Sequence, residues 1–137
     1  MTDVQFHRGR LIDHIQFVVE DVEANLRFYE AVLAVLNVPV VKGDGYFYAD
    51  DLFVSGGAPL TGRCHLAFQA LDLETVDAFH AAGLAAGGRD NGAPGPRDYH
   101  PGYYAAFLLD PAGNNIEAVY HGPAVRSAAS VVIEAAL

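Results

Sequence analysis

The stretch HIQFVVEDVEANLRF at residues 14–28 returns 51 positions later as HLAFQALDLETVDAF at residues 65–79. Self-similarity at a fixed spacing indicates that one supersecondary unit is used twice in the chain. Conservative replacements, such as Val22 and Leu73, fall in the same register. The identical pairs are His14 and His65, Phe17 and Phe68, Asp21 and Asp72, Glu23 and Glu74, and Phe28 and Phe79.

Each copy of the unit predicts a strand that leads into a helix. Residues 11–19 are rich in apolar and β-branched side chains, which is typical of a strand. Asp21 follows as the expected N-cap, because its side chain can accept a hydrogen bond from the first turn of a helix. From Val22 to Leu36, apolar residues recur at steps of three and four, which is the spacing of one helix face. Asn37 and Pro39 are expected to end that helix.

Shorter elements complete each half. Three strands are predicted at 38–41, 46–49 and 52–54, separated by Gly- and Asp-rich turns. The linker 55–62 follows.

In the second half we expect a helix at 73–84 and a long Gly- and Pro-rich loop at 90–102 with room for one edge strand. Strands at 103–109 and 115–120 are joined by a DPAGN turn at 110–114. The expected fold class is α+β, in one domain over 1–137. Its parts are a first module over 10–55, a second over 63–122 and a C-terminal extension over 123–137.

Composition excludes several classes of protein. A chain of 137 residues with 52% hydrophobic residues has enough apolar surface for one folded core. Because 17 acidic residues stand against 8 basic ones, binding to nucleic acid or to an anionic membrane is not expected. A single cysteine and the lack of an apolar leader predict a cytoplasmic protein without disulfides.

Strand alternation places three metal-ligand side chains on equivalent faces. Successive side chains of a strand point to opposite faces of the sheet. In the strand at 11–19 the odd-numbered positions are mostly apolar, so His14 lies on the other face. In the strand at 64–70 the even-numbered positions are apolar, so His65 lies on the other face. In the last strand Glu117 likewise lies opposite the apolar positions. If the two sheets curl toward each other, these side chains converge.

Two imidazoles and one carboxylate suit a divalent metal with open coordination positions. A lone histidine on a strand is ordinarily a hydrogen-bonded, half-buried residue. Two histidines at equivalent places in a repeat, together with Glu117, instead favour a metal site formed by His14, His65 and Glu117.

At these residues the chain resembles the vicinal oxygen chelate superfamily, which includes glyoxalase I, fosfomycin-resistance enzymes, extradiol dioxygenases and bleomycin-resistance proteins. The motifs that carry the resemblance are DHI at 13–15, NLRFY at 25–29, HLAF at 65–68 and FLLDPAGNNIE at 107–117. The resemblance implies two paired βαβββ modules that form a cupped, partly open β-barrel around a divalent metal (Fe, Mn, Ni, Zn or Co). The family's ligand positions match His14, His65 and Glu117. Since modules of two subunits often share a site in this family, a homodimer is expected.

The resemblance implies an enzyme that binds a small oxygenated substrate for lyase, isomerase or ring-cleaving chemistry. The alternative is a sequestering protein like the bleomycin-resistance relatives, which bind a small molecule without turnover. The chain differs from three branches of the family, and each difference argues against assignment to that branch. Glyoxalase I enzymes have an extra Glu ligand where this chain has 51–54, and extradiol dioxygenases have a Tyr where it has Phe107. Fosfomycin-resistance enzymes have polar residues that bind their substrate at three positions where this chain has Pro101, Ala105 and Phe107.

Five further residues are candidates around the metal. Tyr103 and His100 are candidate catalytic residues that orient substrate or transfer a proton. Gln16, Gln69 and Arg97 are candidate substrate-binding residues, and the two glutamines flank the predicted ligands on the polar faces. The tail from 125 to 137 is expected to pack on a neighbouring subunit.

Overall fold

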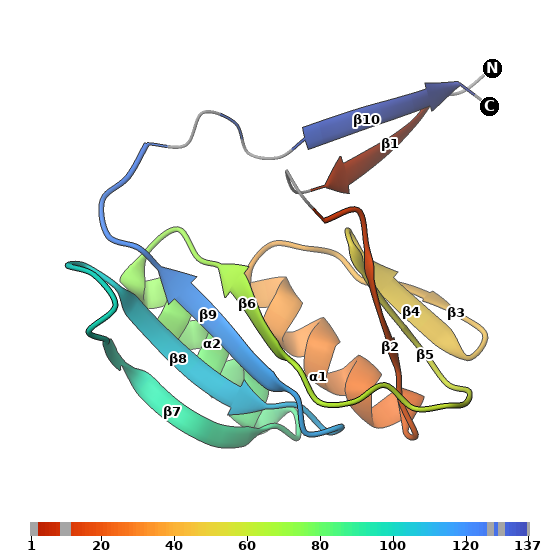
Figure 1. The fold of residues 1–137 in the computed structure, drawn as a ribbon, viewed down its shortest axis with the longest axis horizontal. Helices are drawn as coiled ribbons and strands as arrows, with labels where there is room; N and C mark the ends of the chain where they lie inside the picture. Colours follow the sequence, from red (N-terminus) through yellow and green to blue (C-terminus); the bar gives the residue numbers. More distant parts are fainter. Residues whose placement is uncertain (1–2, 9–11, 126–127, 129–130, 137) are drawn as a thin grey trace.

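Two βαβββ modules form the body of the molecule in the computed structural model, which describes residues 3–8, 12–125, 128 and 131–136 (Figure 1). The first module contains β2 (Ile15–Val18), α1 (Val22–Val35), β3 (Val41–Gly43), β4 (Tyr46–Ala49) and β5 (Leu52–Ser55). The second contains β6 (His65–Gln69), α2 (Leu73–Ala85), β7 (Arg89–Pro96), β8 (Tyr104–Leu109) and β9 (Asn115–Tyr120). The predicted α+β class and the repeated module are confirmed.

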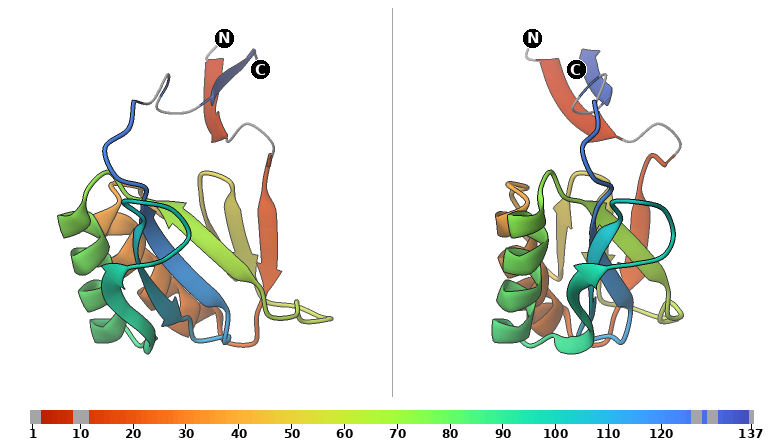
Figure 2. Two further views of the ribbon diagram at one scale, coloured as in Figure 1. Left: turned by 60° about the vertical axis from the view of Figure 1, so that its left-hand side comes forward. Right: turned by 90° about the vertical axis from the view of Figure 1, so that its left-hand side faces the viewer.

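Each module forms its own four-stranded mixed sheet. The strand order is β2-β5-β4-β3 in one sheet and β6-β9-β8-β7 in the other. In both sheets the first strand of the module pairs in parallel with the last one, and the remaining pairs are antiparallel. The sheets do not close on themselves, and both helices lie on the same side of them (Figure 2). The opposite faces therefore stay open in both modules.

The repeated sequence explains why both helices begin where they do. The side chain of Asp21 accepts a hydrogen bond from the backbone N–H of Ala24, and Asp72 accepts one from Thr75. Each carboxylate thus satisfies an otherwise free N–H of the first helical turn. Both predicted N-caps are confirmed.

The predicted strand faces are confirmed by burial. Phe17 of β2 and Val19, which directly follows the strand, are buried in the core, while Gln16 is exposed. In β6 all three odd-numbered residues are exposed. The core between helices and sheets contains Phe17, Phe28, Phe79, Leu108 and Ile116.

Three expected boundaries differ from the structure. The strand expected at 11–19 is shorter, since among its described residues only 15–18 pair. The strand expected at 38–41 instead begins at Val41, because Pro39 has no N–H to give to a ladder. The Gly- and Pro-rich stretch at 90–102 contains much of the edge strand β7, whose register with β8 shifts around Gly92 and Gly95.

The two ends of the chain pair with each other. β1 (Asp3–Arg8) and β10 (Val131–Ala136) form an antiparallel ribbon that stands apart from the modules (Figure 1). The sequence did not predict β1, and the packing of the tail on a neighbouring subunit stays a prediction. Some of the tail, including residues 126–127 and 129–130, lies outside the described residues. Neither helix in the described part of the chain has the length and apolar character needed to cross a bilayer.

Candidate metal and substrate site

His65 and Glu117 meet on the open face of the second module. They lie on β6 and β9, which are neighbouring parallel strands. The His65 Nε2 atom is 2.7 Å from Glu117 Oε1. Glu117 is almost fully buried, with 2% of its side chain exposed, whereas 53% of the His65 side chain is exposed. Glu117 is therefore shielded from solvent by its neighbours on that face, whereas His65 is open to solvent.

Tyr103 holds the second oxygen of that carboxylate. Its hydroxyl donates a hydrogen bond to Glu117 Oε2. Burial, with a further contribution from Glu117, raises the pKa of Tyr103 to about 12. The phenol therefore keeps its proton at neutral pH and remains a donor. Tyr103, Glu117 and His65 form one connected group, as expected for residues of a shared site.

His14 lies away from this group, just before β2 in the other sheet. Its Nδ1 atom is 2.7 Å from Asp13 Oδ1, and 65% of its side chain is exposed. Among the described residues, no three His, Cys, Asp or Glu side chains are placed to hold a metal together. A single chain thus brings together two of the three predicted ligands, and the complete site stays a prediction.

A cavity of about 840 Å³ adjoins Tyr103 where the loop between β7 and β8 meets the end of β9. Tyr103, His100 and Arg97 all line it, although they were predicted as site residues for separate reasons. Much of the remaining wall is aromatic or apolar, including Leu73 and Tyr104. Such a lining with a few polar groups is typical of small-molecule sites.

His100 pairs with His121, the residue that directly follows β9. His100 Nδ1 is 2.9 Å from the carbonyl oxygen of Pro101, and its Nε2 is 2.8 Å from His121 Nδ1. Because a carbonyl only accepts, Nδ1 of His100 carries the proton. When both rings are neutral, Nδ1 of His121 then donates to Nε2 of His100. The available signal for His121 was its spacing of four residues from Glu117, which continues the alternation of that strand just past its end.

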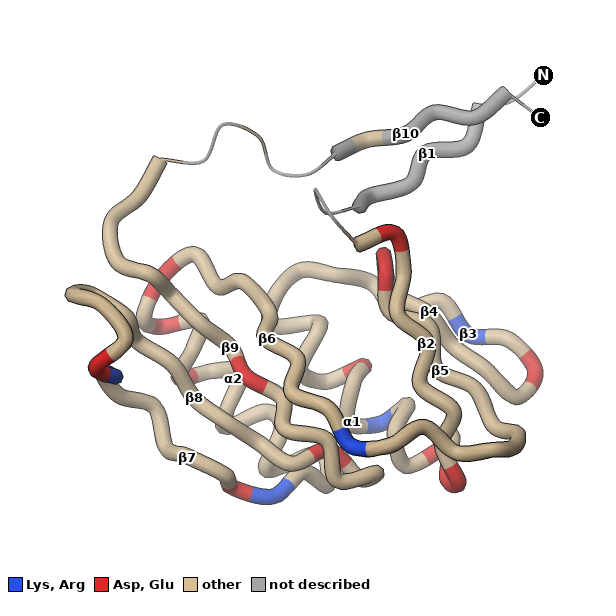
Figure 3. The backbone as a smooth tube through the Cα atoms, in the orientation of Figure 1, with Lys and Arg blue, Asp and Glu red and all other residues tan. Residues whose placement is uncertain are grey.

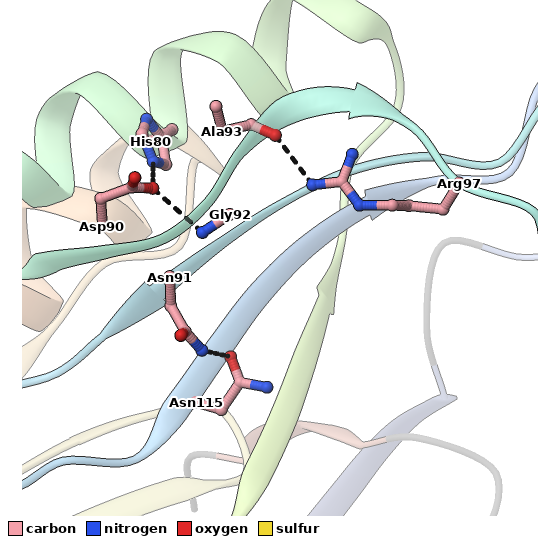
Figure 4. Close-up of polar contacts among 7 residues, drawn as sticks. All are labelled: His80, Asp90, Asn91, Gly92, Ala93, Arg97 and Asn115. Carbon is pink, nitrogen blue, oxygen red and sulfur yellow. Dashed lines mark hydrogen bonds and ion pairs between the residues drawn. The ribbon is translucent and has the colours of Figure 1, made fainter.

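Arg97 lies over the ring of Phe107, with its guanidinium carbon 5.3 Å from the ring centroid. Phe107 in turn lies 5.9 Å from the His65 ring. The guanidinium donates to the carbonyls of Ala93 and Gly95 on β7, one of which is drawn in Figure 4. Arg97 therefore stabilises the irregular edge strand and places a positive charge over the Phe107 ring.

The two candidate glutamines lie on the open faces as predicted. Gln16 donates from Nε2 to Ser55 Oγ at 3.0 Å, which joins β2 to β5. Gln69 is exposed at the end of β6, on the same face as His65. The two side chains belong to different sheets, and their substrate-binding roles stay predictions.

His80 and Asp90 form a polar pair that the sequence analysis missed. His80 Nε2 on the buried face of α2 is 2.9 Å from Asp90 Oδ1 on β7 (Figure 4). The same oxygen accepts the backbone N–H of Gly92 at 3.0 Å. His80 directly follows buried Phe79, so its helical position was the available signal. The pair links the helix to the irregular edge strand.

Replacing Asp90 with Asn should reduce stability most above the usual titration range of Asp. The Gly92 N–H and then the His80 bond hold the pKa of Asp90 below its ordinary value. A lowered folded-state pKa stabilises the fold at higher pH, and this contribution is lost as pH falls through that pKa. The difference in unfolding free energy between wild type and D90N should therefore shrink from about pH 6 to about pH 3. Urea unfolding at both pH values measures it, and a difference that grows in acid would contradict the assignment.

Comparisons with known proteins agree with this architecture. A family model described as the Glyoxalase/Bleomycin resistance protein/Dioxygenase superfamily matches residues 34–118. A glyoxalase/bleomycin resistance protein from Albidiferax ferrireducens is 32% identical, with 80% of this chain and 97% of that chain covered and a TM-score of 0.64. The sequence has no significant match among curated proteins.

Two more distant structures share the fold. The fosfomycin resistance protein FosX from Mesorhizobium loti is 21% identical, with 82% of this chain and 92% of that chain covered and a TM-score of 0.59. A glyoxalase I mutant from Zea mays is 23% identical, with 79% of this chain and 45% of that chain covered and a TM-score of 0.56. At these identities the likeness concerns the fold alone.

Proposed function

Because the chain belongs to the Glyoxalase/Bleomycin resistance protein/Dioxygenase superfamily, we propose that it is a metal-dependent enzyme acting on a small oxygenated substrate. The reaction is of the lyase, isomerase or ring-cleaving class. His65 and Glu117 of one chain hold the divalent metal together with His14 of a second copy. The observation that carries this proposal is the close approach of His65 to the buried Glu117 carboxylate.

The donor set fits such an ion in its chemistry. One carboxylate and two imidazoles suit Fe, Mn, Ni, Zn or Co and leave coordination positions open. The ion would supply Lewis-acid stabilisation of negative charge that develops on substrate oxygens. His65 and Glu117 already lie together, so one ligand from a second copy completes the set. This is the reason for proposing a homodimer.

The neighbouring side chains would orient Glu117 and the substrate. Tyr103 fixes one carboxylate oxygen by its hydrogen bond, which leaves the other oxygen directed at His65. The cavity would give the substrate a place beside Tyr103, which links it to Glu117, although neither Glu117 nor His65 lines the cavity. His100, which lines this cavity, is hydrogen-bonded to His121 and can pass a proton along that bond.

Metal analysis of purified protein and of two single variants tests the site. Wild type should retain about one ion per chain after gel filtration, and H14A and H65A should each retain less than about a tenth of that amount. Unfolding and refolding a mixture of the two variants should restore about a quarter of the wild-type content, because a mixed dimer rebuilds one of its two sites. Refolding each variant alone is the matched control.

A site within one chain would give no recovery in the mixture. Equal metal in wild type and H65A would overturn the metal site.

The second candidate function is that of a sequestering protein. It is favoured by the aromatic and apolar lining of the cavity and by the lack of three assembled ligands among the described residues of one chain. Metal-free protein that binds ligands without converting them would support that alternative.

A further inference from the structure

The loop at residues 97–103 joins β7 to β8 and forms a compact unit. The Arg97 N–H donates to the Tyr103 carbonyl at 3.0 Å, which closes the base of the loop. Within the loop, the Tyr103 N–H donates to the His100 carbonyl at 3.2 Å. Because both bonds lie inside the loop, they fix its shape but do not attach it to the rest of the molecule.

Two features hold this loop against the residues that follow β9. His100 Nε2 lies 2.8 Å from His121 Nδ1. In addition, Gly102 approaches Gly122 so closely that a Cβ on Gly102 would lie 3.3 Å from the Gly122 Cα. Both glycines have positive φ, which glycine adopts without strain. Among the described residues, no other hydrogen bond joins the loop to the segment 121–123, so the histidine pair acts as its latch.

The two imidazole rings of the latch meet end to end. Their centroids are 5.1 Å apart and their planes are 17° from parallel. Because the two nitrogens are only 2.8 Å apart at this centroid separation, the rings lie along one line and are not offset face to face. A proton on one of these nitrogens therefore points at the other nitrogen. Both residues are exposed, so the pair exchanges protons with the solvent.

The number of protons on the pair decides whether the bond can form. When both rings are neutral, His100 keeps its proton on Nδ1 toward the Pro101 carbonyl, and His121 donates from Nδ1 to Nε2 of His100. One added proton can go to Nε2 of His121, and the bond remains. A second added proton has to go to Nε2 of His100, where two N–H groups would face each other and two positive charges would repel. The bond and a doubly charged pair therefore exclude each other.

Few charged groups surround the pair. The Tyr103 ring packs edge-on against both imidazoles, with centroids 5.3 and 5.2 Å away, and its hydroxyl is bonded to Glu117 on β9. The charged residues of the loop are Arg97 and Asp98, which are blue and red in Figure 3. On α2, Asp77 is bonded to another tyrosine of the cavity wall. Among the described residues, no carboxylate forms an ion pair with either imidazole, so a double charge on the pair is not neutralised by a direct partner. The other titratable side chains that line the cavity are Tyr99, Tyr104 and Tyr120.

We propose that residues 97–103 form a lid on the cavity, which the bond between His100 and His121 keeps closed and which acid releases. The lid supplies one part of the cavity wall, and the end of β9 with the residues after it supplies another. Breaking the bond between these two parts would let the lid move away and widen the entrance. Since the closed lid accepts one ring proton fewer than the open lid, a falling pH favours opening. This device goes beyond the proposed function and requires no metal.

Hydrogen–deuterium exchange of the full chain, followed by mass spectrometry, tests the lid. Wild type, H100Q and H121A are compared at about pH 7.5 and about pH 5.0, because histidine changes charge in this range. Rates are corrected for the intrinsic effect of pH on amide exchange. In wild type, opening of the lid amides should rise at least about tenfold at the lower pH, because a difference of one proton allows up to about tenfold per pH unit.

The variants separate release by protons from a merely structural role of the pair. H100Q offers His121 an amide oxygen that accepts but does not titrate, so opening of its lid should change less than about twofold between the two pH values. H121A lacks the donor, and its lid should be open at both pH values. H121N, whose amide nitrogen can donate to His100, should restore protection at the higher pH.

Peptides from α2 are the internal control, since they report unfolding of the whole module and should stay protected throughout. The same rise in H100Q as in wild type would overturn the proposal. So would a wild-type lid that does not respond to acid, or an H121A lid that is as protected as wild type at the higher pH. A rise that α2 shares is unfolding of the module and also counts against an acid-released lid.

Discussion

Replacement of Asp110 by alanine is expected to lower the free energy of unfolding by about 4 kcal/mol, because it leaves several buried donors without a partner. Asp110 is 1% exposed in the turn between β8 and β9. Its Oδ1 accepts the backbone N–H groups of Ala112 and Asn114 at 2.9 and 2.8 Å. Its Oδ2 accepts the Asn114 amide at 2.9 Å and the Tyr29 hydroxyl at 2.5 Å. Since Tyr29 is on α1, this carboxylate joins the two modules.

Tyr29→Phe is the matched control, because it removes one of these bonds and keeps the ring. Burial and then the charge of Asp110 raise the pKa of Tyr29, so the hydroxyl remains a donor at neutral pH. We expect Y29F to cost about 1–2 kcal/mol. In urea unfolding followed by circular dichroism, the losses of stability caused by D110A and Y29F should not add in the double variant, because both changes remove the bond between Tyr29 and Asp110. A loss below about 1 kcal/mol for D110A would contradict this role.

Replacement of Gly83 by valine is expected to cost about 3 kcal/mol or more through overpacking. Gly83 is buried in α2 where it faces both α1 and β8. A Cβ at this position would lie 2.2 Å from Leu108 Cδ1, 3.1 Å from Val32 Cγ1 and 3.3 Å from Phe28 Cε1. The glycine costs about 1 kcal/mol in helix propensity, so close packing is the reason it is needed.

Ala81→Val on the exposed side of the same helix is the control for β-branching, and it should cost no more than about 0.7 kcal/mol. Adding Leu108→Ala to G83V should recover part of the loss, because the smaller side chain gives the valine room. Urea unfolding measures the stability of wild type, A81V, G83V and the G83V/L108A double variant. If A81V and G83V were equally stable, α1 and α2 would accommodate the valine at position 83 without cost, and close packing would not be the reason for the glycine.

Some elements of the fold were predictable from the sequence and others were not. The caps at Asp21 and Asp72 and the turn at 110–114 were predictable, since each depends on side chains within a few residues. The edge strand β7 was less definite, because its Gly and Pro residues give no alternation and its pairing depends on β8. The ribbon of β1 and β10 joins opposite ends of the chain, so no local sequence pattern predicts their pairing.

The candidate site divides in the same way. The face on which His65, Glu117 and Tyr103 lie followed from strand alternation. Their contact depends on the order in which β6, β9 and β8 pair, which local periodicity does not encode. His100 and His121 likewise meet only because a loop returns to the end of β9.

The sequence by itself determined a twice-used unit of strand, cap and helix, and it determined which side chains each strand turns away from its helix. These properties depend on spacings of two and of three to four residues, which the chain carries locally. Only the tertiary structure decided that the acidic ligand touches one predicted imidazole and lies apart from the other. The reason is that distances between strands depend on sheet order and on the packing of one module against another, and both are set by contacts far apart in the chain.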